Sequence, residues 1–547
     1  MRARPFLSAL AVVLAVTLTG FAALTWATAH KGPMSLVVQP LNVPKTARFI
    51  PQQADLALHW LGDPARLPAY AQAVAPDHRR REARETVASL RTGLFALASI
   101  DYERELRTWL GPEVSAALLI QSEDITDSGW ILVLSSRDRD GARQFLQRFW
   151  QTRSFAGAEL QTSQYRGVSL ISGRGTFLGR EPQTLATALV DDELLLASSQ
   201  GILKQALDNS QFGLENQLED GRYDCITQRY RSGVALLSAS PRGLEVWLGM
   251  SPALTQRSDL VGLVATLSLD NTTLQLDGSI NFSSLFESTT TSADTSQLLA
   301  NAGGAASALA LLSNPADLLI GKGSNPLVQW IRPILRRQLG GAGFAASAVA
   351  ELDRGPLLWL QEAAGWAFVT SDGQPDITTV DAQLTNNSIV HSSLPAESFS
   401  GEGTNSVDVW TYIARQRGRG SNDADALRAE LVMAHAVSPG QSWWSNSLAA
   451  LQQRHIKRDL QPRLAQVRDL ATNEAPKWTQ QVALNADLAA GLLSSWRPWI
   501  LMQTLAGRQL LPSLRGLALA VAAENPTVDG QGENHTNLQL RARLSFG

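Results

Sequence analysis

The side chains best suited to acid–base or metal chemistry in this chain are seven histidines, and they are widely spread. They stand at His30, His59, His78, His391, His435, His455 and His535. No two of them have the HxH or HxxxH spacing that brings two imidazoles to one metal ion. The sequence therefore predicts no metal site and no cofactor. His59 lies in an expected strand, and we interpret it as a packing residue.

Motifs for nucleophilic or phosphate chemistry are also missing. The chain contains no G-x-S-x-G elbow, no Walker loop and no complete G-x-G-x-x-G. The single cysteine, Cys225, cannot form an internal disulfide and is interpreted as a plain core or surface residue. We predict no catalytic residue, and the binding residues are unknown. An active site assembled from distant residues stays open, so a hydrolase remains our third hypothesis.

Composition indicates what kind of fold must hold any functional site. The chain has 547 residues, of which 44% are hydrophobic and 18% charged, which is enough apolar material for large cores and more than one domain. Its 47 Lys and Arg nearly balance its 50 Asp and Glu, for a net charge of −3. This balance argues against a nucleic-acid partner.

The N-terminus predicts a membrane anchor. Arg2 and Arg4 precede an apolar run over residues 6–29, long enough to span a bilayer with the arginines on the cytoplasmic side. The alternative is a signal peptide cleaved after the small residues at 27–29. Residues 30–49 hold three prolines and are interpreted as a tether. The closest approach to a second apolar run, residues 488–507, is broken by Arg497 and Pro498.

The body of the chain contains two segments of similar sequence. Residues 57–67 (ALHWLGDPARL) resemble residues 308–318 (ALALLSNPADL). Further matches follow in the same order at separations of 251, 250, 254 and 264 residues: Pro64 with Pro315, Trp109 with Trp359, Gly262 with Gly516, and Leu274 with Leu538. Such regular spacing indicates duplication. We therefore predict repeat one at 50–283, a linker at 284–303 and repeat two at 304–547.

Each predicted repeat combines strands and helices. The opening strands are followed by Asp63 and Asn314, which we expect to cap a helix whose first turn contains a proline. Alternating apolar runs turn at residues 191–192 and 438–440, which indicates hairpins. The predicted fold class is α+β, with a mainly antiparallel sheet and covering helices in each repeat. One arrangement packs the two repeats face to face about a pseudo-twofold axis.

Several blocks of repeat one resemble a known family. They are ADLALHWLGDPARL, YERELRTWLGPEVSAALL, ILVLSSRDRDGARQFLQRF, YRGVSL and ALVDDELLLASSQGILKQAL. Together they are similar to a bacterial, notably cyanobacterial, family of membrane-anchored exported proteins catalogued as domain of unknown function 3352. The resemblance implies an envelope or thylakoid setting. It implies no reaction, ligand or functional residue, and it weakens in repeat two around residues 388–406.

These observations lead to a functional expectation. We expect a non-enzymatic, single-pass membrane protein whose body faces the periplasm or thylakoid lumen and acts as a protein-interaction scaffold or assembly factor. The alternative is a carrier of a lipid or other apolar ligand. Cleavage of the N-terminal segment would instead release a secreted protein. The expected partners are the membrane, through the N-terminal helix, and a protein or lipid.

Overall fold

The computed structural model describes most of the chain beyond the N-terminal segment. The described residues are 33–96, 98–120, 128–176, 182–212, 215–286, 295, 298–299, 306–321, 323–385, 387, 389–395, 406–416, 426–453, 461–471, 478–507, 509–524, 527–528 and 534–547. The predicted anchor at 1–29, its alternative cleavage site and most of the predicted linker at 284–303 lie outside them. Within this part of the chain, every helix is too short or too polar to cross a bilayer.

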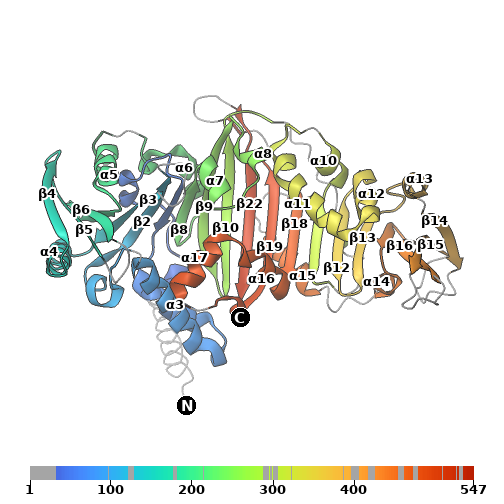
Figure 1. Cartoon of the computed structure of the whole chain (residues 1–547), viewed down its shortest axis with the longest axis horizontal. Coiled ribbons are helices and arrows are strands. Elements are labelled where there is room, and N and C mark those ends of the chain that lie inside the picture. Colours follow the sequence, from blue (N-terminus) through green and yellow to red (C-terminus); the bar gives the residue numbers. More distant parts are fainter. Residues whose placement is uncertain are drawn as a thin grey trace, which may run out of the picture.

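One antiparallel sheet of 20 strands runs through the molecule (Figure 1). The strands of residues 56–282 follow one another in space from the outer edge to the centre. Their order is β4 (Glu159–Tyr165), β5 (Val168–Thr176), β6 (Pro182–Val190), β7 (Glu193–Ala197), β3 (Ser128–Ser136), β2 (Leu110–Ile120), β1 (Leu56–Trp60), β8 (Ala235–Ala239), β9 (Leu260–Asp270) and β10 (Thr273–Phe282).

The sheet continues without a break through the second half of the chain. From the opposite edge to the centre, the order is β14 (Val390–Pro395), β15 (Ser406–Gln416), β16 (Ala426–Ser438), β17 (Gln441–Ser445), β13 (Gly365–Ser371), β12 (Leu357–Glu362), β11 (Ala308–Leu312), β18 (Gln480–Asn485), β19 (Leu514–Ala523) and β22 (Leu538–Phe546). A separate two-stranded ribbon is formed by β20 (Thr527–Val528) and β21 (Asn534–His535).

The two halves of the chain meet at a seam between β10 and β22. Thr273 lies opposite Ser545 and Ile280 lies opposite Leu538 in this antiparallel pair. The halves therefore lie side by side in one sheet, and the face-to-face packing considered from the sequence is wrong. The physical reason is that both strands carry backbone groups that need partners, and pairing with each other satisfies them.

Helices cover both faces of the sheet. Clusters of buried side chains place α5 (Gln200–Phe212), α6 (Gly221–Arg229), α14 (Leu448–Gln453) and α15 (Gln461–Leu470) on one face. The other face carries α2 (Leu67–Val74), α3 (Arg80–Ala96), α4 (Arg139–Phe155), α7 (Pro241–Val246), α8 (Pro252–Thr255), α10 (Pro315–Ile320), α11 (Pro326–Ala342), α12 (Phe344–Leu352), α13 (Ile377–Thr385), α16 (Ala486–Ser494) and α17 (Arg497–Ala506). The fold is thus a mixed helix and strand fold dominated by a large antiparallel sheet.

The helix caps and hairpin turns lie where the sequence predicts them. The Asp63 side chain accepts a hydrogen bond from the Ala65 N–H, and the Asn314 side chain accepts one from the Asp317 N–H, so both predicted caps are confirmed. Asp191 has a φ of 52° in the turn between β6 and β7. Gly440 has a φ of 76° in the turn between β16 and β17, which confirms the second predicted hairpin.

Residues 33–49 belong to the folded body. They form two short 3-10 helices, η1 (Pro33–Leu36) and η2 (Lys45–Phe49). Leu36 and Phe49 are buried in separate apolar clusters, because each covers a strip of sheet that would otherwise face water. The extended tether expected over 30–49 is therefore wrong from Pro33 onward, and residues 30–32 lie outside the described part.

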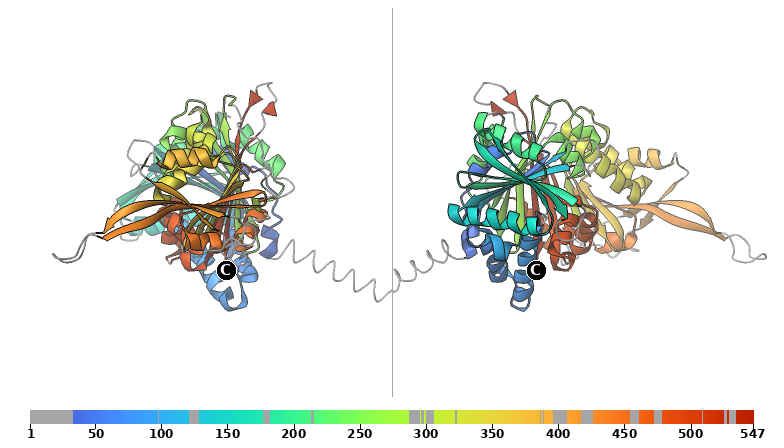
Figure 2. Two further views of the ribbon diagram at one scale, coloured as in Figure 1. Left: turned by 90° about the vertical axis from the view of Figure 1, so that its right-hand side faces the viewer. Right: turned by 60° about the vertical axis from the view of Figure 1, so that its left-hand side comes forward.

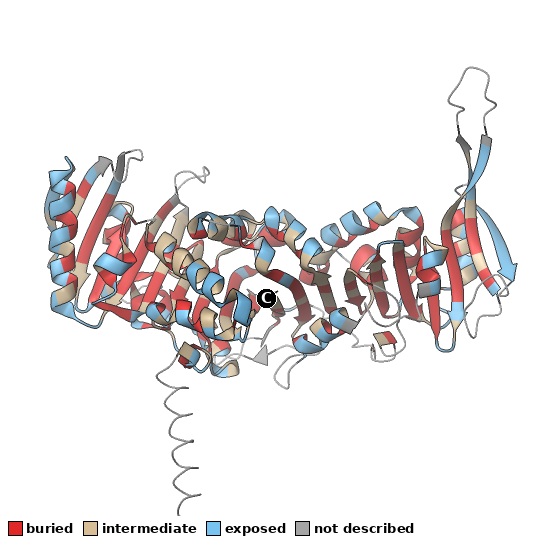
Figure 3. Ribbon diagram, turned by 90° about the horizontal axis from the view of Figure 1, so that it is seen from below, coloured by how far each residue is buried: buried red, intermediate tan, exposed pale blue. Residues whose placement is uncertain are grey.

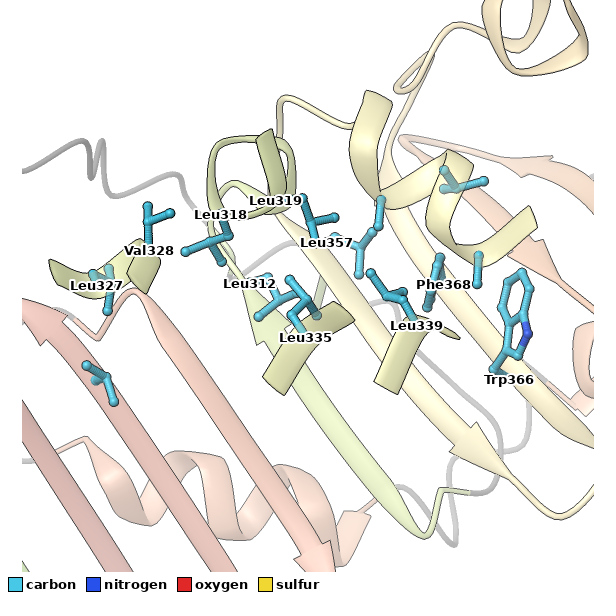
Figure 4. Packing of buried hydrophobic residues seen from close by; sticks show 14 of the residues in the cluster. Leu312, Leu318, Leu319, Leu327, Val328, Leu335, Leu339, Leu357, Trp366 and Phe368 are labelled. Atoms are coloured by element: carbon cyan, nitrogen blue, oxygen red, sulfur yellow. The ribbon is translucent and has the colours of Figure 1, made fainter. Parts of the chain in front are cut away.

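Burial follows the centre of the sheet along its whole length (Figure 3). The largest cluster joins the two halves, since residues of β9, β10, α11, β12 and β13 all contribute to it. Figure 4 shows 14 of its members, and those that are labelled point from α10, α11 and the neighbouring strands into one apolar layer. At the far end, by contrast, β14, β15 and β16 project from the body (Figure 2).

Candidate functional site

An apolar cavity of about 300 Å³ lies where the two halves of the chain meet. Its walls come from α2 and α3, the turn between β9 and β10, α17 with the segment that follows it, and the end of β22. The apolar members of the lining are Leu67, Tyr70, Ala71, Val74, Ala75, Ala83, Val87, Leu90, Leu269, Leu274, Trp499, Met502, Leu510, Leu544 and Phe546. Such a lining suits a hydrocarbon ligand.

α3 and α17, which both contribute to the lining, cross closely at one point. A Cβ atom at Gly93 would lie 2.1 Å from the backbone oxygen of Leu505, so only glycine permits this approach. Trp499 of α17 is fully buried beside the cavity, and its indole N–H has no hydrogen-bond partner among the described residues. Because this N–H has almost no accessible surface, it is enclosed in the packing of α17 and is not open to the cavity.

The rim of the cavity carries a few polar groups. The Tyr70 hydroxyl donates to the backbone oxygen of Asn271 at 2.9 Å, and burial together with the charge of Asp270 raises the pKa of Tyr70 to about 12. Arg79 lies 3.4 Å from the Glu82 carboxylate and donates to the backbone oxygen of Gly547. The rim therefore offers neutral donors and an internally compensated ion pair.

A second cluster surrounds His59, which is completely buried on β1. Because the Oε1 atom of Gln217 can only accept, His59 Nε2 donates to it at 2.7 Å, and Nδ1 accepts from the Ser115 hydroxyl at 2.7 Å. Thr46 and Tyr223 complete this network through Ser115 and Gln217. Burial lowers the pKa of His59 to about 4. The interpretation of His59 as a packing residue agrees with this environment.

The Ser115–His59 contact has the atoms of a nucleophile and its base, but not their accessibility. Both side chains are fully buried, and the third member is an uncharged glutamine amide. A catalytic serine needs an open approach for its substrate. The arrangement therefore serves to anchor η2 to the sheet rather than to perform acyl transfer.

A third cluster lies at the far end of the sheet. Asp408 of β15 contacts His391 Nε2 at 3.2 Å and His435 Nδ1 at 3.5 Å. His391 stacks on Trp410, and the hydrogen bonds from His435 and His391 hold the pKa of Asp408 below its usual range. No sequence motif marks this cluster, because its members come from three paired strands, and only the strand register brings them together.

The other chemistry-bearing residues remain apart. His78 is exposed, Cys225 is exposed on α6, and His30 and His455 lie outside the described residues. Among the described side chains, no group of three or more His, Cys, Asp or Glu has the geometry to hold a metal ion. The apolar cavity is thus the candidate site.

The fold and the cavity define a helix-covered, single-sheet protein with an apolar site between its halves. The profile of a family described as "Protein of unknown function (DUF3352)" matches residues 9–538, and the chain belongs to this family. No curated protein matches the chain.

Two solved structures of TP0453 are weakly similar in shape. Crystal form I has a TM-score of 0.27 and 8% identity, covering 45% of this chain and 81% of that one. Crystal form III has a TM-score of 0.25 and 9% identity, covering 45% and 83%. Similarity at this level carries no argument about function.

Proposed function

We propose that this protein is a membrane-anchored, extracytoplasmic binder of an apolar ligand with the chemistry of a lipid acyl chain. The carrying observation is the cavity of about 300 Å³, at the lower end of the volume range of small-molecule sites. This was the alternative expectation from the sequence, and the cavity now favours it.

Filling the cavity tests this proposal. Ala83→Trp places an indole among the lining residues of α3, whereas Ala88→Trp changes the same helix outside the lining. Binding of a fluorescent fatty acid to the full chain in detergent should weaken roughly tenfold or more in Ala83→Trp, since each lost contact area of a few tens of Å² costs about 1 kcal/mol. Equal binding by the two variants would overturn the proposal.

The anchor is the second part of the proposal. Residues 1–29 would hold the body on the periplasmic or thylakoid-lumen side of a bacterial, and by family resemblance cyanobacterial, membrane. Support comes from the apolar run over 6–29 and its preceding arginines. Intact mass after membrane extraction separates this anchor from a cleaved, secreted form, which would lack the first 29 residues.

A protein-interaction scaffold is the second candidate function. It is favoured by the exposed apolar side chains on β14, β15 and β16, of which Ile413 and Leu427 are 67% and 72% exposed. Both residues lie where β15 and β16 pair only with each other, and such open strand edges pair readily with other chains. Pull-down from solubilised membranes should return a specific partner that is lost from an Ile413→Ser, Leu427→Ser variant. A pull-down without such a partner would argue against the scaffold.

We also propose that residues 50–283 and 304–547 are tandem homologous repeats joined by a linker at 284–303. The strand orders given above support this, as does the register at the centre. Gly262 pairs with Asn281, and Gly516 pairs with Ser545, at the 254- and 264-residue separations found in the sequence. The sequence match of 57–67 with 308–318 aligns His59 with Ala310. The strand register counted from Gly262 and Gly516 instead makes His59 equivalent to Leu311, one residue further on.

Duplication explains one feature of the seam. Asp277 and Arg541 are separated by 264 residues, so they are equivalent positions, and they lie directly opposite each other in the pair β10–β22. In two identical units the same residue would face itself at this point. Here an acid faces a base, and the pair is buried. The two repeats would thus have diverged to fit each other.

A further inference from the structure

The helical hairpin α16–α17 exposes an unusual number of large apolar side chains. Leu488, Leu492, Ile500 and Leu501 are 40%, 51%, 45% and 38% exposed. This hairpin covers the run at 488–507 that comes closest to a second membrane segment in the sequence. The opposite side of the hairpin packs on the body, since Leu493 and Trp499 are buried against the sheet and beside the cavity.

The hairpin carries little charge to repel a lipid surface. Its two helices contain one acidic residue, Asp487, and one basic residue, Arg497. Helices with an apolar outer face bind flat on a bilayer, with their side chains among the acyl chains and headgroups. Trp496, half-buried between the two helices, holds the hairpin to the body, since its ring packs on the buried cluster beneath and its indole N–H donates to the backbone oxygen of Leu248 at 3.3 Å.

The length of chain between the body and the predicted anchor limits what can cover this hairpin. The apolar N-terminal run ends at Ala29, and the described body begins at Pro33 in η1. Four residues of fully extended chain reach at most about 14 Å. If residues 6–29 span a bilayer, η1 must therefore lie close to the membrane surface.

A continuous helical layer connects that entry point with the hairpin. η1 packs on α2, α2 packs on α3, α3 packs on α17, and α17 packs on α16. Figure 1 shows α3, α17 and α16 along one long side of the molecule. Met34 and Val38, beside the entry point, are also exposed apolar residues.

We propose that the outer face of α16–α17 rests on the lipid bilayer that holds the N-terminal anchor. The inference rests on the proposed anchoring and adds an orientation to it: the cavity wall formed by α17 lies next to the membrane, so an acyl chain can pass between bilayer and cavity over a short distance. The proposed occupant of this face is a lipid surface, and a second copy of the chain is the competing occupant.

Site-specific quenching tests the proposal on the full chain reconstituted in phosphatidylcholine vesicles. The exposed Cys225 is first replaced by serine. An environment-sensitive fluorophore is then attached through Leu492→Cys or Ile500→Cys, with Ile413→Cys at the far end of the sheet as a control at a more exposed apolar residue. Lipids carrying a nitroxide on the acyl chain serve as the quencher.

The expected result is that fluorescence at positions 492 and 500 falls roughly twofold or more while position 413 stays unchanged, since only buried interfacial side chains reach the acyl region. Absence of quenching at 492 and 500 in vesicle-bound protein would overturn the contact surface and leave the anchor standing. Equal quenching at position 413, or disulfide cross-linking of Ile500→Cys between copies in place of quenching, would also overturn it. Failure of the chain to co-purify with vesicles would overturn both the anchor and the contact surface, whereas fatty-acid binding is measured independently in detergent.

Discussion

The seam between β10 and β22 and the outer strands β14–β16 use the same antiparallel pairing but differ in what covers them. At the seam, Asp277 and Arg541 are 1% and 2% exposed, and Arg541 also donates to the backbone oxygen of Leu470 in α15. On β14 every side chain is exposed. Pairing alone therefore does not bury a strand. Strands are buried by covering helices from distant parts of the chain. These helices therefore determine how much a substitution lowers the free energy of unfolding.

The largest effect is expected at the seam. Arg541→Met leaves the buried Asp277 carboxylate without its ion pair, and this should lower the free energy of unfolding by about 3–5 kcal/mol. Urea unfolding of the full chain in detergent measures the loss. The double variant Asp277→Leu, Arg541→Met should be less destabilised than the single variant, because no buried charge remains. Additive losses would contradict the idea that the pair acts as a unit.

A second covered site should respond to pH. Burial lowers the pKa of His59 from 6.5 to about 4. Between pH 4 and pH 6.5 this side chain is therefore protonated in the unfolded chain and neutral in the folded chain. Stability from this group is therefore complete above pH 6.5 and falls by about 3 kcal/mol as the pH drops to 4.

His59→Gln removes the titrating group while keeping a polar side chain. Unfolding free energies at pH 7 and pH 5 should differ less in this variant than in the parent protein. A difference of the same size in both proteins would assign the pH dependence to other groups.

An intermediate effect on stability is expected at the crossing of α3 and α17, where steric contact outweighs helix propensity. Gly93→Ala should destabilise by about 1–3 kcal/mol because its Cβ would collide with the Leu505 backbone, although alanine is the better helix former by about 1 kcal/mol. Thermal unfolding should show a lower Tm, and fatty-acid binding should weaken with it.

Gly340→Ala in α11 is the matched control, since nothing lies within 4 Å of its added Cβ. This variant should raise the stability by about 0.5–1 kcal/mol. A stabilised Gly93→Ala variant would show that α17 can move away freely and that the cavity wall is not tightly held.

The smallest effect is expected on the outer strands. Ile413→Ser removes an apolar side chain that is already exposed to water, so the free energy of unfolding should change by no more than about 0.5 kcal/mol. A loss of several kcal/mol in chemical unfolding would mean that this side chain is covered in solution, and the contrast with the seam would disappear.

Local sequence signals predicted many elements correctly. The caps at Asp63 and Asn314, the hairpin turns at 191–192 and 438–440, and the dominance of an antiparallel sheet all follow from side-chain chemistry within a few residues. The candidate site could not be predicted in the same way. Its walls come from segments as far apart as Leu67 and Phe546, and no local motif encodes a shared cavity.

By itself the sequence determined the strand and helix types, the helix caps and turns, and the similarity between its two halves, because these depend on periodicity and on the backbone preferences of individual residues. Tertiary structure alone decided that the halves join edge to edge, that His59 is sealed in a neutral network, and that Gly93 admits α17 beside the cavity. Each of these outcomes depends on which distant surfaces complement one another, and such complementarity is a property of the assembled sheet and not of any single segment.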